Sequence, residues 1–246
     1  GSVSLGSLTV INGSASIAAL AELLLHSVYC ASGASITIQS GGDVTIDGTL
    51  RVDGAVTISS SGGDVTVTGR ITGTLALTGD GLSISGGNVA LGDIELTNTF
   101  ADSDKELTIA ARGTLVTGAL TLIGIDFAIT SGGDTTIGGD VVIDPSTITQ
   151  TVDGGDLTFG GAVTVIDGST FHVVVTGGNV IFQDKVLVAG KATLDVLATN
   201  VSGAGGAVAF NETVAIAAAT LNVSADGDIT FAKGLTAADT FTHHDV

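Results

Sequence analysis

The residues best placed to do chemistry are acidic side chains that recur in a Gly-Gly-Asp or Gly-Gly-Asn turn. The turn occurs at residues 41–43, 62–64, 86–88, 132–134, 154–156 and 177–179. Ca²⁺ is a hard cation that takes carboxylate oxygens. The candidate calcium ligands are therefore Asp43, Asp64, Asp134 and Asp156. An Asp or Asn in such a turn also accepts a hydrogen bond from a nearby backbone N–H, and we expect this structural role to dominate, with no obligatory cofactor.

Motifs that would indicate catalysis are not found in the sequence. There is no G-x-S-x-G nucleophile turn, no phosphate-binding loop and no zinc-ligand spacing. The acidic residues lie mostly in repeated turns, and no motif selects two of them as an acid–base pair. We therefore expect a protein that is not an enzyme.

The charge balance restricts the partners. The chain has 25 acidic and 7 basic residues, for a net charge of -18, and the basic residues are scattered. A phosphate backbone requires clustered Lys and Arg, so nucleic acid is an unsuitable partner. The apolar run at 18–25 is too short to span a membrane. Cys30 is the single cysteine, so no intrachain disulfide can form, and we expect it to be buried.

Four Asn-x-Ser/Thr sequons are possible glycosylation sites if the source has the machinery. They begin at Asn12, Asn200, Asn211 and Asn222.

The element that positions all these residues is a repeat of two or three short alternating strands. Asp156–Val165 shows it most plainly, with two strands separated by glycines. The first strands of eleven such units follow Ser2, Glu22, Asp43, Asp64, Asn88, Glu106, Asp134, Asp156, Asn179, Ala207 and Asp228. Three short strands in about 22 residues are typical of one coil of a parallel β-helix. The sequence thus predicts an all-β fold, a right-handed parallel β-helix (β-solenoid) of about eleven turns, as a single domain over residues 1–246.

Inward-facing residues of successive coils should form rows along the axis. One predicted row is Val44, Val65, Val89, Leu107, Thr135, Leu157, Val180, Val208 and Ile229. Its neighbour is Ile46, Val67, Leu91, Ile109, Ile137, Phe159, Phe182, Phe210 and Phe231. The four consecutive Phe residues should stack in the core, and we interpret them as packing rather than as a cofactor site.

Two alternatives remain open at this stage. Residues 1–30 could include a cap, because Ala15–Cys30 has the apolar spacing of an amphipathic helix. The competing interpretation keeps residues 22–25 in register as the second coil. Two tandem antiparallel sandwiches are a further possible fold.

The repeats G-G-D-V-T-I-D-G-T-L-R-V-D-G at 41–54 and G-G-D-L-T-F-G-G-A-V-T-V at 154–165 carry a family resemblance. They resemble repeats of filamentous-haemagglutinin-type and related giant bacterial surface proteins. The resemblance implies an extracellular or cell-surface location. It also implies a structural fibre or rod segment, or alternatively an adhesin that binds carbohydrate or a receptor through its loops.

The repeat pattern reaches close to both ends of the chain, so we expect the ends to be open. An open β-helix end exposes unpaired strand edges and an apolar channel. The residues expected at the two ends are Val3, Leu5, Ile229, Phe231 and Phe241. The sequence therefore predicts that the ends either continue into more of the same polypeptide or stack on another copy, and stacking would give self-association into a head-to-tail homopolymer.

Overall fold

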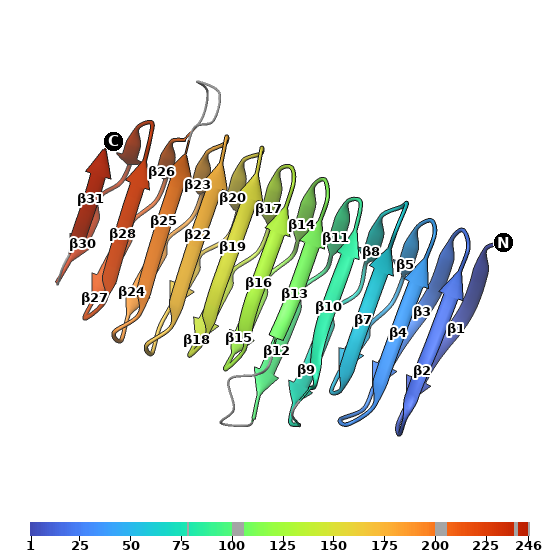
Figure 1. Ribbon diagram of the computed structural model, residues 1–246. Coiled ribbons are helices and arrows are strands. Elements are labelled where there is room, and N and C mark those ends of the chain that lie inside the picture. The colour runs from blue at the N-terminus through green and yellow to red at the C-terminus, as the bar shows by residue number, and fades with distance from the viewer. Residues whose placement is uncertain (78, 100–105, 200–205, 239–240, 246) are drawn as a thin grey trace.

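The chain winds into stacked coils of β-strand. The computed structural model describes residues 1–77, 79–99, 106–199, 206–238 and 241–245 (Figure 1). These residues form thirty-one strands and no helix. The strands lie in one row from the N-terminus to the C-terminus, with the two termini at opposite ends (Figure 1).

One sheet contains eleven strands, one from each coil. They are β2 (Ser14–Ala19), β4 (Ser35–Ser40), β7 (Ala55–Ser60), β10 (Gly81–Gly86), β13 (Glu106–Ala111), β16 (Asp126–Ser131), β19 (Thr147–Asp153), β22 (Thr170–Thr176), β25 (Thr193–Thr199), β28 (Thr220–Ala225) and β31 (Phe241–Asp245).

The other sheet contains twenty strands and supplies the remaining sides of each coil. Two long strands, β1 (Val3–Val10) and β3 (Leu23–Cys30), begin it. One set of short strands follows the Gly-Gly-Asp turns: β5 (Val44–Ile46), β8 (Val65–Val67), β11 (Val89–Leu91), β14 (Leu115–Thr117), β17 (Thr135–Ile137), β20 (Leu157–Phe159), β23 (Val180–Phe182), β26 (Val208–Phe210) and β29 (Ile229–Phe231). The next set is β6 (Leu50–Val52), β9 (Ile71–Leu75), β12 (Ile94–Asn98), β15 (Leu120–Ile123), β18 (Val141–Asp144), β21 (Val163–Val165), β24 (Val186–Ala189), β27 (Val214–Ala217) and β30 (Leu235–Ala237).

All pairing is parallel and joins one coil to the next. In β5 and β8, for example, Val44 pairs with Val65 and Ile46 with Val67. The coils are spaced about 22 residues apart, and the fold is an all-β parallel β-solenoid of about ten turns. This confirms the predicted fold class and excludes the antiparallel sandwiches. The right-handed sense of winding stays an expectation from the crossover preference of parallel strands.

The core is a narrow channel filled by every second residue of each strand. Val65 and Val67 are 0% and 1% exposed, whereas Thr66 between them faces out and is only half-buried. Alternation of this kind follows from the two-residue period of a strand.

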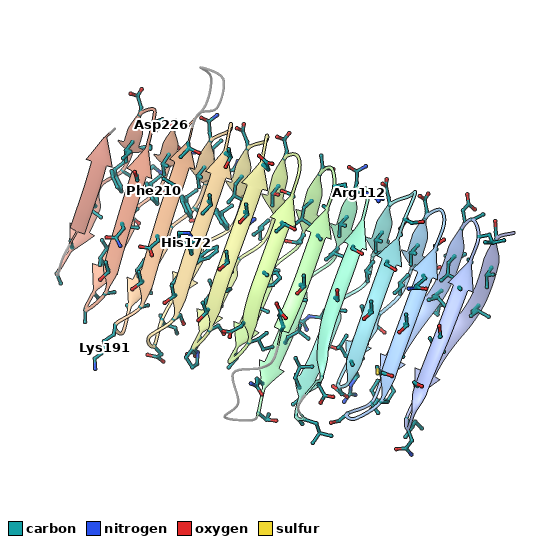
Figure 2. The ribbon with its side chains drawn as sticks, in the orientation of Figure 1. Arg112, His172, Lys191, Phe210 and Asp226 are labelled. Carbon is teal, nitrogen blue, oxygen red and sulfur yellow. The ribbon has the colours of Figure 1, made fainter. Side chains whose placement is uncertain are left out.

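The predicted phenylalanine stack is confirmed. Phe159, Phe182, Phe210 and Phe231 follow one another at centroid distances of 4.7, 4.7 and 4.8 Å, with interplanar angles of 8°, 4° and 3°. These distances match the spacing of adjacent strands, about 4.8 Å. Phe171 contacts Phe159 edge to face at 5.7 Å. The rings, of which Figure 2 labels Phe210, pack coil on coil as part of the core.

One of the eleven predicted repeat starts is wrong. Leu107 and Ile109 belong to β13 in the eleven-stranded sheet, where Leu107 pairs with Phe127. Leu115 instead pairs with Val89 and Thr135 and takes the place in the row that we assigned to Leu107. The preceding turn, Arg112-Gly113-Thr114, has no carboxylate, which is why the pattern was missed there.

The helical alternative for Ala15–Cys30 is also wrong. These residues fall in β2 and β3, and Leu23 pairs with Val44 as the in-register interpretation requires. Leu23, Leu25, Val28 and Cys30 are all buried, while Leu20 in the connecting turn is 88% exposed. A helix would have placed Leu20 on the buried face, so the two-residue period of the strand prevails.

A glutamine without hydrogen-bond partners interrupts one of the apolar rows. Gln150 is 0% exposed, and neither its side-chain nitrogen nor its oxygen has a hydrogen-bond partner. Its register neighbours are Ile129 and Val173. A buried polar group without a partner costs about 1–3 kcal/mol.

We predict that Val65→Asp destabilises the fold by more than about 3 kcal/mol, because it leaves an unpaired charge in the channel. Thr66→Asp, one residue away and facing out, should change the free energy of unfolding by no more than about 0.5 kcal/mol. Urea unfolding of both variants checks this. Equal costs would mean that the inward and outward faces are wrongly assigned.

We also predict that Gln150→Met stabilises the protein by about 1 kcal/mol, since it removes two unsatisfied polar atoms at similar volume. Gln39→Met is the matched control, because Gln39 is exposed on β4. The midpoint of urea unfolding should rise for the first variant only. A loss of stability in Gln150→Met would show that the glutamine has a partner.

Candidate functional site

The acidic turns form a hydrogen-bonded ladder in two runs, Asp43 to Thr114 and Asp134 to Ala207. Within each run, the backbone N–H of a turn residue donates to the side-chain oxygen of the equivalent residue one coil earlier. Asp64 N donates to Asp43 Oδ1 at 2.9 Å, and Asn88 N donates to Asp64 Oδ1 at 2.8 Å. Asp156 N donates to Asp134 Oδ1 at 2.9 Å. We call this set the Asx ladder, and it continues through Thr114 N to Asn88, Asn179 N to Asp156 and Ala207 N to Asn179.

Other turns use the same arrangement. Ala119 N donates to Asp93 Oδ1 and Ala162 N donates to Asp140 Oδ1, both at 2.9 Å. Thr147 N donates to Asp126 Oδ1 at 3.1 Å at the start of β19. Side-chain carboxylates therefore satisfy backbone donors in several of the turns that leave the strand ladder.

The glycine before each ladder residue leaves room for the carboxylate of the coil below. A Cβ on Gly63 would lie 2.3 Å from Asp43 Oδ1, and one on Gly113 would lie 2.4 Å from Asn88 Oδ1. A Cβ on Gly155 would lie 2.4 Å from Asp134 N. Real Cβ atoms do not approach so closely. The turn therefore needs a glycine at this position to make room for the side chain of the neighbouring coil.

This geometry places the four candidate calcium ligands in a structural role. The Oδ1 atoms of Asp43, Asp64, Asp134 and Asp156 each accept a backbone N–H. Among the residues that the structure describes, no three His, Cys, Asp or Glu side chains gather where they could hold a metal ion. Calcium binding stays a prediction with a modest expected effect.

The ladder also affects titration. Hydrogen bonds from the Asn88 backbone, and then from its side chain, lower the pKa of Asp64 below its ordinary value of 3.8. A lowered carboxyl pKa stabilises the fold above the unfolded-state pKa and ceases to do so as the pH falls through the folded-state value. The contribution of Asp64 is therefore present at neutral pH and lost in acid.

Arg112 is a residue that sequence analysis missed. Its Nη1 donates to the backbone oxygen of Ser61 at 2.8 Å, two coils away, and its charge further lowers the pKa of Asp64. Figure 2 labels it beside the turns. The only sequence signal was a basic residue at a turn position that is usually Gly.

A cluster of charged and aromatic side chains brings together residues that lie far apart in the sequence. The Arg51 guanidinium lies 5.0 Å from the centroid of the Tyr29 ring and forms an ion pair with Asp53. Arg70 pairs with Glu95 on the neighbouring coils. Coil lengths vary, so only the register reveals that these side chains share one face.

The residues predicted for the two ends lie in the terminal coils. Val3 is partly buried and Leu5 is 40% exposed, whereas their register partners Leu23 and Leu25 are 1% and 0% exposed. Ile229 and Phe231 are partly buried at the other end. Phe241 begins β31, whose described backbone pairs with β28.

Three of the four sequons are accessible. Asn12, Asn211 and Asn222 are exposed, and Asn222 contacts Asp195 on the neighbouring strand. Asn200 lies outside the described residues.

Cys30 is 0% exposed, as expected. Burial first, and then the carboxylates of Asp80 and Asp53, raise the pKa of its thiol to about 11.

Comparison with protein-family models, with curated proteins and with solved structures finds no match in any of the three. The structure agrees with a β-helix repeat protein at the level of fold. The described residues contain no helix of the length and apolarity that a membrane crossing needs.

For the Asx ladder we predict that Asp134→Ala lowers stability by about 1 kcal/mol, because the N–H of Asp156 loses its acceptor. Asp134→Asn keeps the oxygen and should remain within about 0.5 kcal/mol of the wild type. Urea unfolding with EDTA and with Ca²⁺ separates the roles. An Asn variant as unstable as the Ala variant, with a wild type sensitive to EDTA, would indicate a metal ligand instead.

For Cys30 we predict no reaction with a thiol reagent in the folded protein at pH 8, because the thiolate is scarce and the sulfur is inaccessible. The thiol should react fully in urea. Rapid reaction of the native protein would contradict the buried position.

Proposed function

We propose that this chain is a structural rod unit that extends by stacking its coils end to end on further copies, outside the cell or at its surface. The observation that carries the proposal is the difference between inner and terminal coils. Rows of residues that are completely buried inside the rod become partly exposed in its first coil. A further coil would complete them.

The first coil is unusually free of charge for so acidic a chain. Residues 1–21 contain no charged side chain, although the whole chain has 25 acidic and 7 basic residues. Its end face presents Leu5, which is 40% exposed, and the partly buried Val3, Leu8 and Ile17. Such a surface is favourable to bury and unfavourable to leave in water.

The strand edges of this coil are unprotected. β1 pairs with β3 and β2 pairs with β4, and no other pairing is found for either strand within the described residues. Natural edge strands are usually protected by Lys, Pro, bulges or covering segments. Neither β1 nor β2 contains Lys or Pro, so both can accept another parallel strand.

The C-terminal coil supplies a suitable counterpart. Val208 and Phe210 are 0% and 1% exposed, while Ile229 and Phe231, one coil further on, are only partly buried. The same apolar channel opens at both ends, so the strands of a second copy can pair with the end strands on all three sides of the coil. The contact would be heterologous and would generate an open filament. The net charge of -18 would oppose sideways clumping.

Sedimentation velocity over a range of concentrations tests this proposal. We expect the wild type to form a series of end-to-end multimers. Leu5→Lys with Ile17→Lys should remain monomeric, because each lysine places a charge on the apolar end face. Thr57→Lys with Thr149→Lys is the charge-matched control, since both residues are exposed in the middle of the rod.

Circular dichroism of all three proteins verifies that the strands persist. A wild type that stays monomeric at high concentration would refute the proposal. So would a control pair that blocks multimers as completely as the end-face pair.

A binding rod of the adhesin type is the second candidate. It is favoured by a polar groove on the side formed by β6, β9 and β12.

A further inference from the structure

Four outward-facing side chains lie side by side on consecutive coils. Tyr29 pairs with Arg51, Arg51 with Thr72, and Thr72 with Glu95. Tyr29 is the only tyrosine of a chain without tryptophan. Two of the three arginines, Arg51 and Arg70, also lie on this face. No row elsewhere on this sheet combines an aromatic ring with both signs of charge within the described residues.

The Arg51 side chain is held in place from two directions. Its guanidinium lies 5.0 Å from the Tyr29 ring centroid. Its Nε and Nη2 each lie 2.8 Å from Asp53 Oδ2. Asp53 is 8% exposed, and its Oδ1 accepts the N–H of Thr74 at 3.0 Å. Because the guanidinium is fixed, its remaining N–H donors are presented to a ligand at little entropic cost.

A groove lies between the two long side chains. Arg51 and Glu95 are two coils apart, about 9.6 Å at the usual strand spacing, and the short Thr72 lies between them. The groove has a volume of about 240 Å³ and is lined mainly by Arg51, Asp53, Thr72, Thr74, Glu95 and Thr97. Gly73 completes the floor without a side chain, and a Cβ there would lie 1.7 Å from the Val52 oxygen.

The charges of the groove are balanced. Arg51 pairs with Asp53, and Arg70 Nη2 lies 2.8 Å from Glu95 Oε2. Arg51, Asp53 and Glu95 give the lining a charge of -1, which the adjoining Arg70 offsets, while the whole chain carries -18. Anions gain nothing from such a lining and are repelled by the chain. Hydroxyl groups, which both donate and accept, match its mixture of guanidinium, carboxylate and threonine groups.

We propose that this groove binds one ring of a neutral carbohydrate. Vicinal hydroxyls would accept from Arg51, donate to Glu95 and exchange hydrogen bonds with Thr72 and Thr97. The volume is below the usual range of about 300–1,000 Å³ for ligand pockets, so the site takes a single sugar unit. The site is independent of end-to-end stacking, and its ligand is bound weakly, with a dissociation constant of roughly 1 mM.

Tyr29 provides a readout through its contact with Arg51, because tyrosine fluorescence of this chain comes from that residue alone. The probes are the methyl glycosides of glucose, galactose, mannose and N-acetylglucosamine, titrated up to roughly 0.1 M. We expect a saturable fluorescence change with at least one of them. Galacturonate serves as the anionic comparison.

Two variants and one control locate the response. Glu95→Gln removes the negative charge of a hydrogen-bond acceptor. The Glu95 side chain is 46% exposed, so the fold should tolerate the change. Thr72→Leu fills the floor of the groove. Each should weaken binding at least about tenfold. Thr164→Leu makes the same change in the same outward row, away from the groove, and should leave the titration unchanged.

The proposal is overturned if none of the four glycosides gives a saturable change. It is also overturned if galacturonate binds more tightly than every neutral glycoside, or if Thr72→Leu binds as the wild type does. Sedimentation results do not affect these outcomes, so failure of the rod proposal and failure of the sugar site remain distinguishable.

Discussion

The structure depends on the contact between one coil and the next. A coil of about 22 residues cannot bury its own apolar side chains, so Val65 depends on Val44 and Val89 in the neighbouring coils to exclude water. The strands supply the hydrogen bonds along the flat sides, and the Asx ladder supplies them at the turns. Gly63 and Asp43 show how closely the two are linked, since the glycine leaves the space that the carboxylate oxygen occupies. Every inner coil therefore stabilises, and is stabilised by, its two neighbours.

This dependence explains the distribution of residue types. The channel takes Val, Ile, Leu and, near the C-terminal end, stacked Phe, because identical shapes repeat well along an axis. Charges are placed on the outside and in turns, where Asp93 and Asp140 hold backbone N–H groups. Glycine is required where coils approach most closely. Side chains that are free to bind a ligand or a partner lie where coil stacking does not require a particular residue. These positions are the outward rows and the two ends.

The fold could be predicted from sequence because the Gly-Gly-Asp turn and the alternating strand after it recur with little change. The phenylalanine stack followed directly, since one strand position fixes its equivalents. The assignment failed at Leu107, where a turn without a carboxylate hid the true start at Leu115. The groove at Arg51 could not be predicted. Tyr29, Thr72 and Glu95 become neighbours only through a register that coils of unequal length conceal.

Hydrogen exchange, resolved by residue, tests most directly whether coils are stabilised by neighbours on both sides. In dilute protein the amides of β1 that face away from β3 should exchange rapidly, while those of β16 and β19 should be strongly protected. At high concentration the same β1 amides should become protected as another copy pairs with them, and the central amides should not change. The account is contradicted if the β1 amides are already slow in dilute protein, or if they stay fast at every concentration.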